Sequence, residues 1–400
     1  MIVLAGGDLV LPDRIVTRGS LVIDGSRIVA VESAPDVEPP GATRVDVSDC
    51  YVVPGFVDVH VHGLEGIDTL DGGSAVADIA TRLPKYGVTA FCPTTVACPP
   101  RDLGGVLAQV RNARVHRAGG SARVLPAHLE SNFINPEYRG AQPATCLRIP
   151  DDSHAEAHEG EFSARDLLEV IATARVDVGI VTLAPELPGG IDLVHTLVAA
   201  GHRVSLGHSG ATFDEAMAAI DAGARHATHL FNRMTPITHR APGLTGAVLA
   251  RDEIVAELIC DGHHVHPAMC RMAIRAKGVG GIMAITDGTA GAGLAPGTAA
   301  RLGGRAIRVT DRAAVLEDGT LAGSTLTMDR AFRTIVSTFG LSIAEAAILC
   351  STTPAREMGL TGFGALADGM TADLVVLDRA FRVVRTFVDG GEVYRRGATT

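Results

Sequence analysis

The polar residues best suited to chemistry in this chain lie at the ends of short apolar runs. Six of them end such runs, and all are histidine, glutamate or aspartate: His60, His62, Glu130, His208, His229 and Asp287. Imidazole and carboxylate groups are suitable ligands for divalent metals such as Zn2+ and Fe2+. A protein-bound metal can acidify water and so support hydrolysis near neutral pH. The residue types therefore predict a hydrolytic metal centre.

The positions of these residues along the chain suggest which of them are metal ligands and which is the general base. One three-ligand site would be formed by Glu130, His208 and His229. His60 and His62 alternate along one strand, so both rings lie on the same face and could hold a second ion. Asp287 would remain free as the base that takes a proton from water. We therefore expect one or two ions per chain, Zn2+ or Fe2+.

Each residue taken singly also fits a structural role. A lone histidine at a strand end can simply be buried and hydrogen-bonded, and Asp287 could cap a helix, since a glycine and a threonine follow it. The combination is what favours chemistry. Six ionisable groups brought to one place would be costly without a cation between them.

The elements that must position these groups are parallel strands. Eight apolar runs recur along the middle of the chain, with helical stretches between most of them: 56–62, 88–95, 124–130, 178–183, 203–208, 225–229, 254–261 and 281–287. This rhythm predicts an α/β fold built on a (β/α)8 TIM-type barrel. In such barrels the carboxyl ends of the strands form one rim, where catalytic groups converge. The six candidate residues end five of the eight predicted strands.

Both ends of the chain differ from this middle part. Short strand-like segments separated by turn residues occupy the first fifty residues and the last thirty-five. We predict that residues 1–53 and 366–400 form a small β-sandwich domain, and that residues 54–365 form the barrel. The segment 135–160 is long and polar, and we expect it to cover the site.

Bulk properties exclude several classes of function. The 400 residues carry a formal net charge of −10, no Trp and only 4 Tyr. This composition argues against binding to nucleic acids or to an anionic membrane surface, although a local pocket could still bind an anionic small molecule. The 7 cysteines are scattered, and no apolar run is long enough to span a membrane. These features predict a cytoplasmic protein.

A set of short motifs makes the prediction more specific. Segments 54–63 (PGFVDVHVHG), 128–130 (HLE), 207–209 (GHS), 228–232 (THLFN), 261–264 (DGHH), 286–287 (TD) and 321–324 (LAGS) occur in this order. With them the chain resembles the N-acetylglucosamine-6-phosphate deacetylase family of the amidohydrolase superfamily. The resemblance implies hydrolysis of N-acetylglucosamine 6-phosphate to glucosamine 6-phosphate and acetate. It also implies the metal ligands proposed above, and Asp287 as general base and acid.

The resemblance further implies a set of substrate contacts. It assigns them to Asn232 and its neighbour Arg233, to Arg240 and His264, to Ala141 and Gln142, and to the backbone of Leu321, Ala322 and Gly323. The arginine at the position of Arg240 reaches into the neighbouring subunit's site in such enzymes, so a homodimer is expected. The partner molecule would be a small, anionic N-acyl compound.

Three departures from the family pattern lie at the substrate side of the predicted site. Ser131-Asn132 replaces the usual Gly-Pro after the glutamate, Gln142 replaces a histidine, and Arg233 replaces a small residue. Glutamine can donate a neutral hydrogen bond to the substrate carbonyl but cannot become cationic. Arg233 either contacts a carboxylate or phosphate, or points to solvent. An alternative substrate is therefore another N-acyl amino sugar or an amino acid-like compound.

Other classes of function are less compatible with the sequence. Cyclic-amide opening by the common two-metal pattern would require a bridging lysine near the fourth strand, where none is evident. A serine hydrolase would need a nucleophile elbow, which neither Ser209 nor Ser324 provides. A catalytically inactive barrel used for binding would not need the full ligand set together with Asp287.

Overall fold

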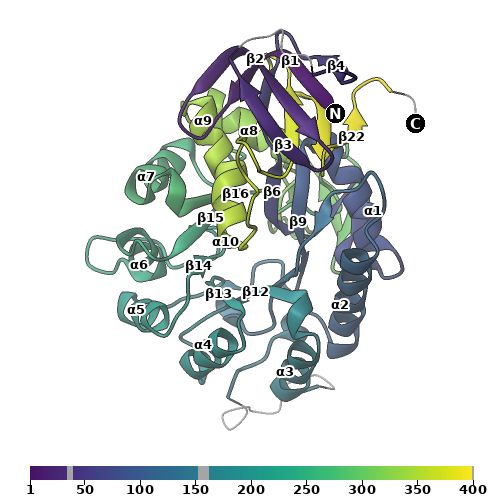
Figure 1. Ribbon diagram of the computed structural model, residues 1–400. Helices are drawn as coiled ribbons and strands as arrows, with labels where there is room; N and C mark the ends of the chain where they lie inside the picture. The colour runs from purple at the N-terminus through teal and green to yellow at the C-terminus, as the bar shows by residue number, and fades with distance from the viewer. Residues whose placement is uncertain (34–38, 152–161, 399–400) are drawn as a thin grey trace.

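The computed structural model describes residues 1–33, 39–151 and 162–398. Eight parallel strands form a nearly closed barrel (Figure 1): β6 (Phe56–Val61), β9 (Val88–Thr95), β11 (Ala127–Glu130), β12 (Val178–Leu183), β13 (Arg203–Leu206), β14 (His226–Ala227), β15 (Val255–Ile259) and β16 (Ile282–Ile285). The circle closes just beyond β16, where the backbone N–H of Asp287 donates to the carbonyl of His60 at 3.0 Å. The predicted barrel is confirmed.

Two strands are shorter or more divided than the sequence suggested. The run 124–130 splits into β10 (Arg123–Val124) and β11, with Pro126 between them, because proline has no N–H to donate to a neighbouring strand. β14 keeps only two residues of the run 225–229. The last residue of that run, His229, takes a left-handed backbone conformation and lies two residues beyond the strand.

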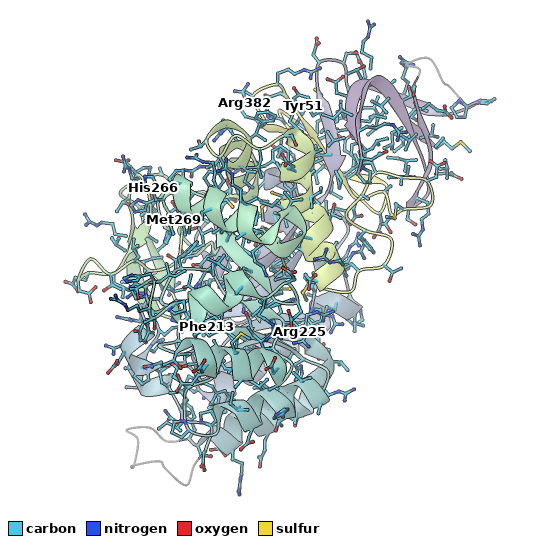
Figure 2. The ribbon with its side chains drawn as sticks, turned by 90° about the vertical axis from the view of Figure 1, so that its left-hand side faces the viewer. Tyr51, Phe213, Arg225, His266, Met269 and Arg382 are labelled. Atoms are coloured by element: carbon cyan, nitrogen blue, oxygen red, sulfur yellow. The ribbon has the colours of Figure 1, made fainter. Side chains whose placement is uncertain are left out.

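Helices surround the barrel: α1 (Ala75–Arg82), α2 (Pro100–Val115), α3 (Ala164–Thr173), α4 (Gly190–Ala199), α5 (Phe213–Asp221), α6 (Gly243–Ala250), α7 (Pro267–Lys277), α8 (Met328–Ser337), α9 (Ile343–Ala347) and α10 (Thr353–Glu357). α5 begins with a capping box in which Thr212 and Glu215 satisfy each other's backbone N–H groups. Phe213 and Met269, from α5 and α7, pack against the apolar core of the barrel (Figure 2). No helix among the described residues is long and apolar enough to cross a lipid bilayer.

The two ends of the chain build one mostly antiparallel sheet beside the barrel. Its order is β22 (Gly391–Arg395), β21 (Val383–Val388), β20 (Leu374–Leu377), β5 (Tyr51–Pro54), β1 (Ile2–Val10), β2 (Ile15–Asp24) and β3 (Arg27–Glu32), and β4 (Thr43–Asp46) also pairs with β1. The pairing of β5 with β20 joins the two ends. The predicted fold class, a barrel with a β domain from both termini, is confirmed. The residue boundaries of the two domains stay a prediction.

A small sheet that the sequence analysis did not predict follows β16. It consists of β17 (Ala299–Leu302), β18 (Arg305–Val309) and β19 (Ala314–Val315), while β7 (Gly63–Leu64) and β8 (Ile67–Asp68) form a further hairpin after β6. The guanidinium of Arg305 donates to the carbonyl of Ala141 at 2.8 Å. The small sheet therefore supports the segment that carries Ala141 and Gln142.

Candidate active site

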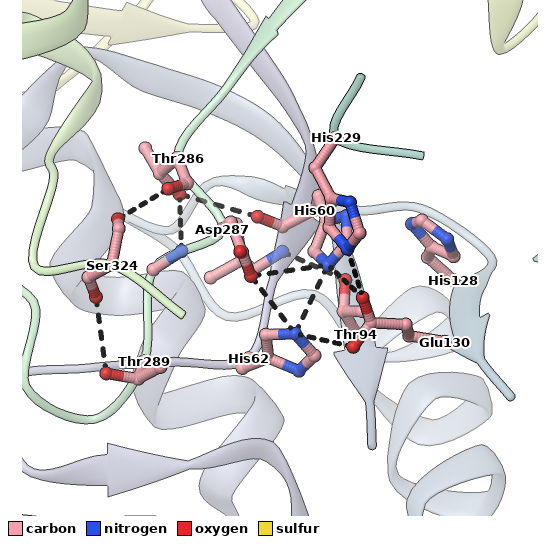
Figure 3. Close-up of polar contacts among 12 residues, drawn as sticks. His60, His62, Thr94, His128, Glu130, His229, Thr286, Asp287, Thr289 and Ser324 are labelled. Atoms are coloured by element: carbon pink, nitrogen blue, oxygen red, sulfur yellow. Dashed lines mark hydrogen bonds and ion pairs between the residues drawn. The ribbon is translucent and has the colours of Figure 1, made fainter. Parts of the chain in front are cut away.

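The six candidate residues converge at the carboxyl rim of the barrel. Figure 3 shows His60, His62, Glu130, His229 and Asp287 together. Glu130 ends β11, whereas His208, His229 and Asp287 each lie two residues beyond their strand. These last three have positive φ angles of 49°, 29° and 50°. Left-handed backbone is unfavourable for residues with a Cβ, and it is concentrated at functional positions in proteins. Here the turn that it produces carries each side chain to the rim.

Three of these residues form one compact group. Glu130 Oε1 lies 2.9 Å from His208 Nε2 and 2.8 Å from His229 Nε2. The two imidazole nitrogens are 3.1 Å apart. The other nitrogen of His208, Nδ1, lies 2.8 Å from the carbonyl oxygen of Tyr138. This contact identifies Nδ1 as the protonated nitrogen, which leaves the lone pair of Nε2 directed at the group.

The other three residues form a second group beside the first. Asp287 Oδ1 lies 3.4 Å from His60 Nε2 and 3.3 Å from His62 Nε2, and these two nitrogens are 3.2 Å apart. Glu130 connects the groups, because its Oε2 lies 3.4 Å from His62 Nε2. Figure 3 shows Glu130 and Asp287 on either side of the His60 and His62 rings.

The electrostatics of the two groups fit bound cations. Burial lowers the pKa of His60 to about 3, so this ring is neutral. Burial opposes protonation of His62 as well, but the carboxylates of Asp287 and Glu130 raise its pKa to about 10. Nδ1 of His62 and Nδ1 of His229 are buried without a hydrogen-bond partner among the described residues. Two divalent ions would supply the positive charge that the carboxylates otherwise draw from protons. The residues present therefore fit a metal centre.

Gln142 contacts a candidate ligand directly. Its amide nitrogen donates to Glu130 Oε2, and its carbonyl oxygen accepts from the backbone N–H of Ala97 at 2.7 Å. The sequence analysis placed this side chain at the substrate. The structure adds that it holds Glu130 in place.

Ser131 and Asn132, the other departure after Glu130, bond to the protein backbone. The hydroxyl of Ser131 donates to the carbonyl of Thr182, and the amide of Asn132 donates to the carbonyls of Cys98 and Cys146 at 2.9 and 2.7 Å. Both residues are buried, and neither lines the cavity. These two positions therefore have a structural explanation, and the departures that face the cavity are Gln142 and Arg233.

A cavity of about 480 Å³ opens above the two groups. Most of the predicted substrate contacts line it: Ala141, Gln142, Asn232, Arg233, His264, Leu321 and Gly323. Two do not. Arg240 is exposed in the segment before α6, and Ala322 is buried in an apolar cluster, with its N–H donating to Ala314 at 3.0 Å.

Two residues of the cavity outside the histidine–carboxylate groups can carry positive charge. Nδ1 of His264 lies 2.6 Å from Asp261 Oδ2, while its buried Nε2 has no partner among the described residues. Burial opposes protonation of His264, but Asp261 raises its pKa above the ordinary value. Arg233 is the only arginine or lysine among the described residues that line the cavity.

The segment expected to cover the site is described only in part. Residues 135–151 are described and include the short helices η3 (Pro136–Tyr138) and η4 (Ala144–Cys146), whereas 152–160 lie outside the described residues. Glu137 and Tyr138 line the cavity. The first half of the segment thus forms one wall of the site.

Sequence reasoning missed a layer of buried acids beneath the rim. Glu257 Oε2 lies 2.9 Å from His60 Nδ1, and Asp58 Oδ2 accepts from the Thr286 hydroxyl at 2.6 Å. The sequence does contain a sign of Glu257, because it is a charged residue inside an apolar run: β15 reads Val-Ala-Glu-Leu-Ile. His128, two residues before Glu130 on β11, has its ring in the barrel interior, with Nε2 2.8 Å from the Thr182 hydroxyl.

Comparison with known proteins agrees with this geometry. Residues 51–393 match the description "Amidohydrolase family". The chain belongs to this family. A human N-acetylglucosamine-6-phosphate deacetylase is 37% identical over 412 residues, covering 99% of this chain and 95% of the relative. An N-acetylgalactosamine-6-phosphate deacetylase of Escherichia coli O157:H7 is 33% identical, covering 94% and 97%.

Solved structures give the same result. A mutant N-acetyl-D-glucosamine-6-phosphate deacetylase of Mycobacterium smegmatis, in complex with N-acetyl-D-glucosamine-6-phosphate, is 32% identical with a TM-score of 0.86. The match covers 98% of this chain and 99% of that one. The predicted family and enzyme class are confirmed: the chain is an amidohydrolase of the deacetylase group.

Proposed function

We propose that this amidohydrolase removes the acetyl group from N-acetylglucosamine 6-phosphate, giving glucosamine 6-phosphate and acetate. The observation that carries the proposal is the pair of histidine–carboxylate groups at the floor of a cavity that also contains Arg233 and His264. The relatives named for this reaction cover nearly the whole chain.

The metal centre would hold Zn2+ or Fe2+ at two subsites. Glu130, His208 and His229 would hold one ion, and His60 and His62 the second, with Glu130 between them. A divalent metal bound here would acidify a water molecule and polarise the amide carbonyl.

Asp287 would perform the proton transfers. Burial disfavours its charged form, but the nearby imidazoles of His60 and His62 hold its pKa below the ordinary value, so the carboxylate is ionised. An ionised carboxylate at this position can take a proton from the attacking water and then return it to the leaving amine. One amide proton of Gln142 is used by Glu130, and the other remains available to the oxygen that becomes negatively charged.

The phosphate would be bound by other residues of the same cavity. His264, Asn232 and Arg233 line it, together with Leu321 and Gly323. Arg240 would act on the phosphate in a neighbouring subunit, which requires a homodimer.

A second candidate substrate is N-acetylgalactosamine 6-phosphate, for which the E. coli relative is named. Another anionic N-acyl compound is also a candidate substrate. Gln142 and Arg233 support this alternative, because both line the cavity and both differ from the family pattern.

The test is release of free amine from a panel of compounds by the purified, metal-loaded protein, with His229→Ala as the blank. The panel contains the 6-phosphates of N-acetylglucosamine and N-acetylgalactosamine, both unphosphorylated sugars and N-acetyl amino acids. The proposal requires the glucosamine derivative to give the highest kcat/KM. A higher value for any other compound would reassign the substrate.

A further inference from the structure

Glu257 lies beneath the two metal-binding groups and contacts residues of both. It belongs to β15, and its side chain is fully buried. Its Oε2 lies 2.9 Å from Nδ1 of His60. The same oxygen accepts the backbone N–H of His229 at 3.3 Å. One carboxylate oxygen thus connects a residue of each group.

The contact with His60 determines which nitrogen of that ring carries the proton. A neutral imidazole has one N–H and one lone pair. A carboxylate 2.9 Å from Nδ1 requires the proton there, which leaves the lone pair on Nε2. Nε2 is the atom that faces Asp287 and His62, at 3.4 and 3.2 Å. His60 is thereby prepared as a ligand through Nε2.

A second ring, that of His128, also lies beside Glu257, with its Nδ1 3.7 Å from Glu257 Oε1. Both nitrogens of His128 have closer partners: Nδ1 faces the carbonyl of Val59 at 3.0 Å, and Nε2 faces the hydroxyl of Thr182 at 2.8 Å. His60 therefore makes the closer contact with Glu257, at 2.9 Å.

We propose that Glu257 is the positioning residue that makes His60 a metal ligand, and that it thereby allows the chain to hold two ions rather than one. The inference rests on the proposed metal centre. A carboxylate behind a ligating histidine fixes the orientation of the ring and increases its basicity, and loss of such a partner lowers metal affinity by about 10- to 100-fold. Glu257 contacts the subsite of Glu130, His208 and His229 at the backbone N–H of His229 and not at a ligand atom, so the ion of that subsite is retained.

The experiment is metal titration of chelator-treated protein with Zn2+ and with Co2+, without substrate. Glu257→Gln keeps an acceptor for the Nδ1–H but removes the charge, whereas Glu257→Leu removes both. The matched control is Glu357→Gln, since Glu357 also faces a buried histidine (His226 Nε2, 3.2 Å) but lies away from the rim.

The wild type and the control should bind two ions per chain. Glu257→Leu should bind one, and Glu257→Gln should bind the second ion about 10- to 100-fold more weakly. In 15N-histidine spectra of the protein, Glu257→Leu should also lose the strongly hydrogen-bonded Nδ1–H signal of His60.

The inference is overturned if both variants bind two ions as tightly as the wild type, or if the wild type binds only one. Should Glu257→Leu fail to fold, the second-ion affinity of Glu257→Gln alone decides the question. Because the titration contains no substrate, a failure here leaves the deacetylase proposal intact. Conversely, absence of activity on the sugar panel would leave the ion count unaffected.

Discussion

The side-chain amide of Gln142 donates a hydrogen bond to Oε2 of Glu130, the carboxylate that connects the two histidine–carboxylate groups of the site. The opposite end of the same amide is fixed by the backbone N–H of Ala97. Gln142→Leu should therefore reduce both kcat and metal affinity, each by about 10- to 100-fold. The control is Gln109→Leu, since Gln109 accepts the backbone N–H of Val76 at 3.4 Å and does not line the cavity. A change in KM alone would mean that Gln142 contacts the substrate without supporting Glu130.

Asp287→Asn should abolish turnover while preserving at least the ion held by Glu130 and its two histidines. The asparagine keeps the size of the side chain but cannot accept a proton from water at neutral pH. Activity should fall by at least about 100-fold, which is the lower end of typical general-base contributions. Metal content per chain is measured on the same sample. Loss of both ions would show that Asp287 is needed for metal binding itself.

Arg233 and Arg240 should both contribute to phosphate binding, but from different subunits. Arg233 lines the cavity of its own chain, whereas Arg240 does not. Arg233→Ala and Arg240→Ala should both raise KM more for the 6-phosphate than for the unphosphorylated sugar, by about 10-fold or more, because a charge-assisted hydrogen bond contributes about 1.5–3 kcal/mol. Equal effects on both sugars would exclude a phosphate contact.

The subunit origin of the two arginines can be separated by mixing. A mixture of Arg240→Ala chains with Asp287→Asn chains should regain activity if Arg240 acts across a dimer, because a hybrid dimer contains one complete site. Arg233→Ala mixed with Asp287→Asn should not. Recovery in the second mixture would place Arg233 in the partner's site.

Gly323→Ala should destabilise the protein and lower kcat. Gly323 has a φ of +55°, and a Cβ there would lie 2.6 Å from Thr289 Cγ2 and 2.9 Å from the carbonyl oxygen of Asp287. The control is Gly319→Ala, which has a similar positive φ of +85° but no atom within 4 Å of the added Cβ. Both variants lose about 1 kcal/mol to the backbone conformation, and Gly323→Ala should lose a further 1–3 kcal/mol or so to overpacking. Equal losses in urea unfolding would contradict the crowding beside Asp287.

Asp373 should make a destabilising contribution that grows as the pH rises from 4 to 7. Burial raises the pKa of this carboxyl to about 6, although it accepts the backbone N–H of Asp389 at 2.7 Å. A folded-state pKa above the unfolded value means that the folded protein binds more protons, so stability is lost as the pH rises through about 6. Asp373→Asn should gain roughly 2–3 kcal/mol relative to the wild type over this range. Urea midpoints at pH 4 and pH 7 measure the difference, and an unchanged difference would refute the assignment.

The rim of the site could be predicted from sequence because its residues end apolar runs. The parallel strands of a barrel bring their carboxyl ends to one side, so a linear pattern becomes a spatial cluster. Strand lengths were less predictable. His208, His229 and Asp287 looked like the last residues of strands, but their left-handed backbone places them beyond the ladder.

The layer behind the ligands could not be predicted in the same way. Glu257 lies inside a strand, and nothing in the local sequence indicates that its neighbour across the barrel is His60, 197 positions earlier. The role of Gln142 as a support for Glu130 likewise depends on a loop conformation held by Ala97 and Arg305. Contacts of this kind arise from tertiary structure, which the periodicity of one segment does not encode.

The pairing of β5 with β20 has a consequence for how the protein is made. Leu374 pairs with Pro54, although 320 positions separate them. At a synthesis rate of about 5–20 residues per second, β20 is synthesised roughly 16–64 s after β5. The edge of β5 that pairs with β20 stays unpaired during this interval. An unpaired strand edge is a template for aggregation during that time. The β domain should therefore be the last part of the molecule to close, and the emerging chain should depend on chaperones until it does.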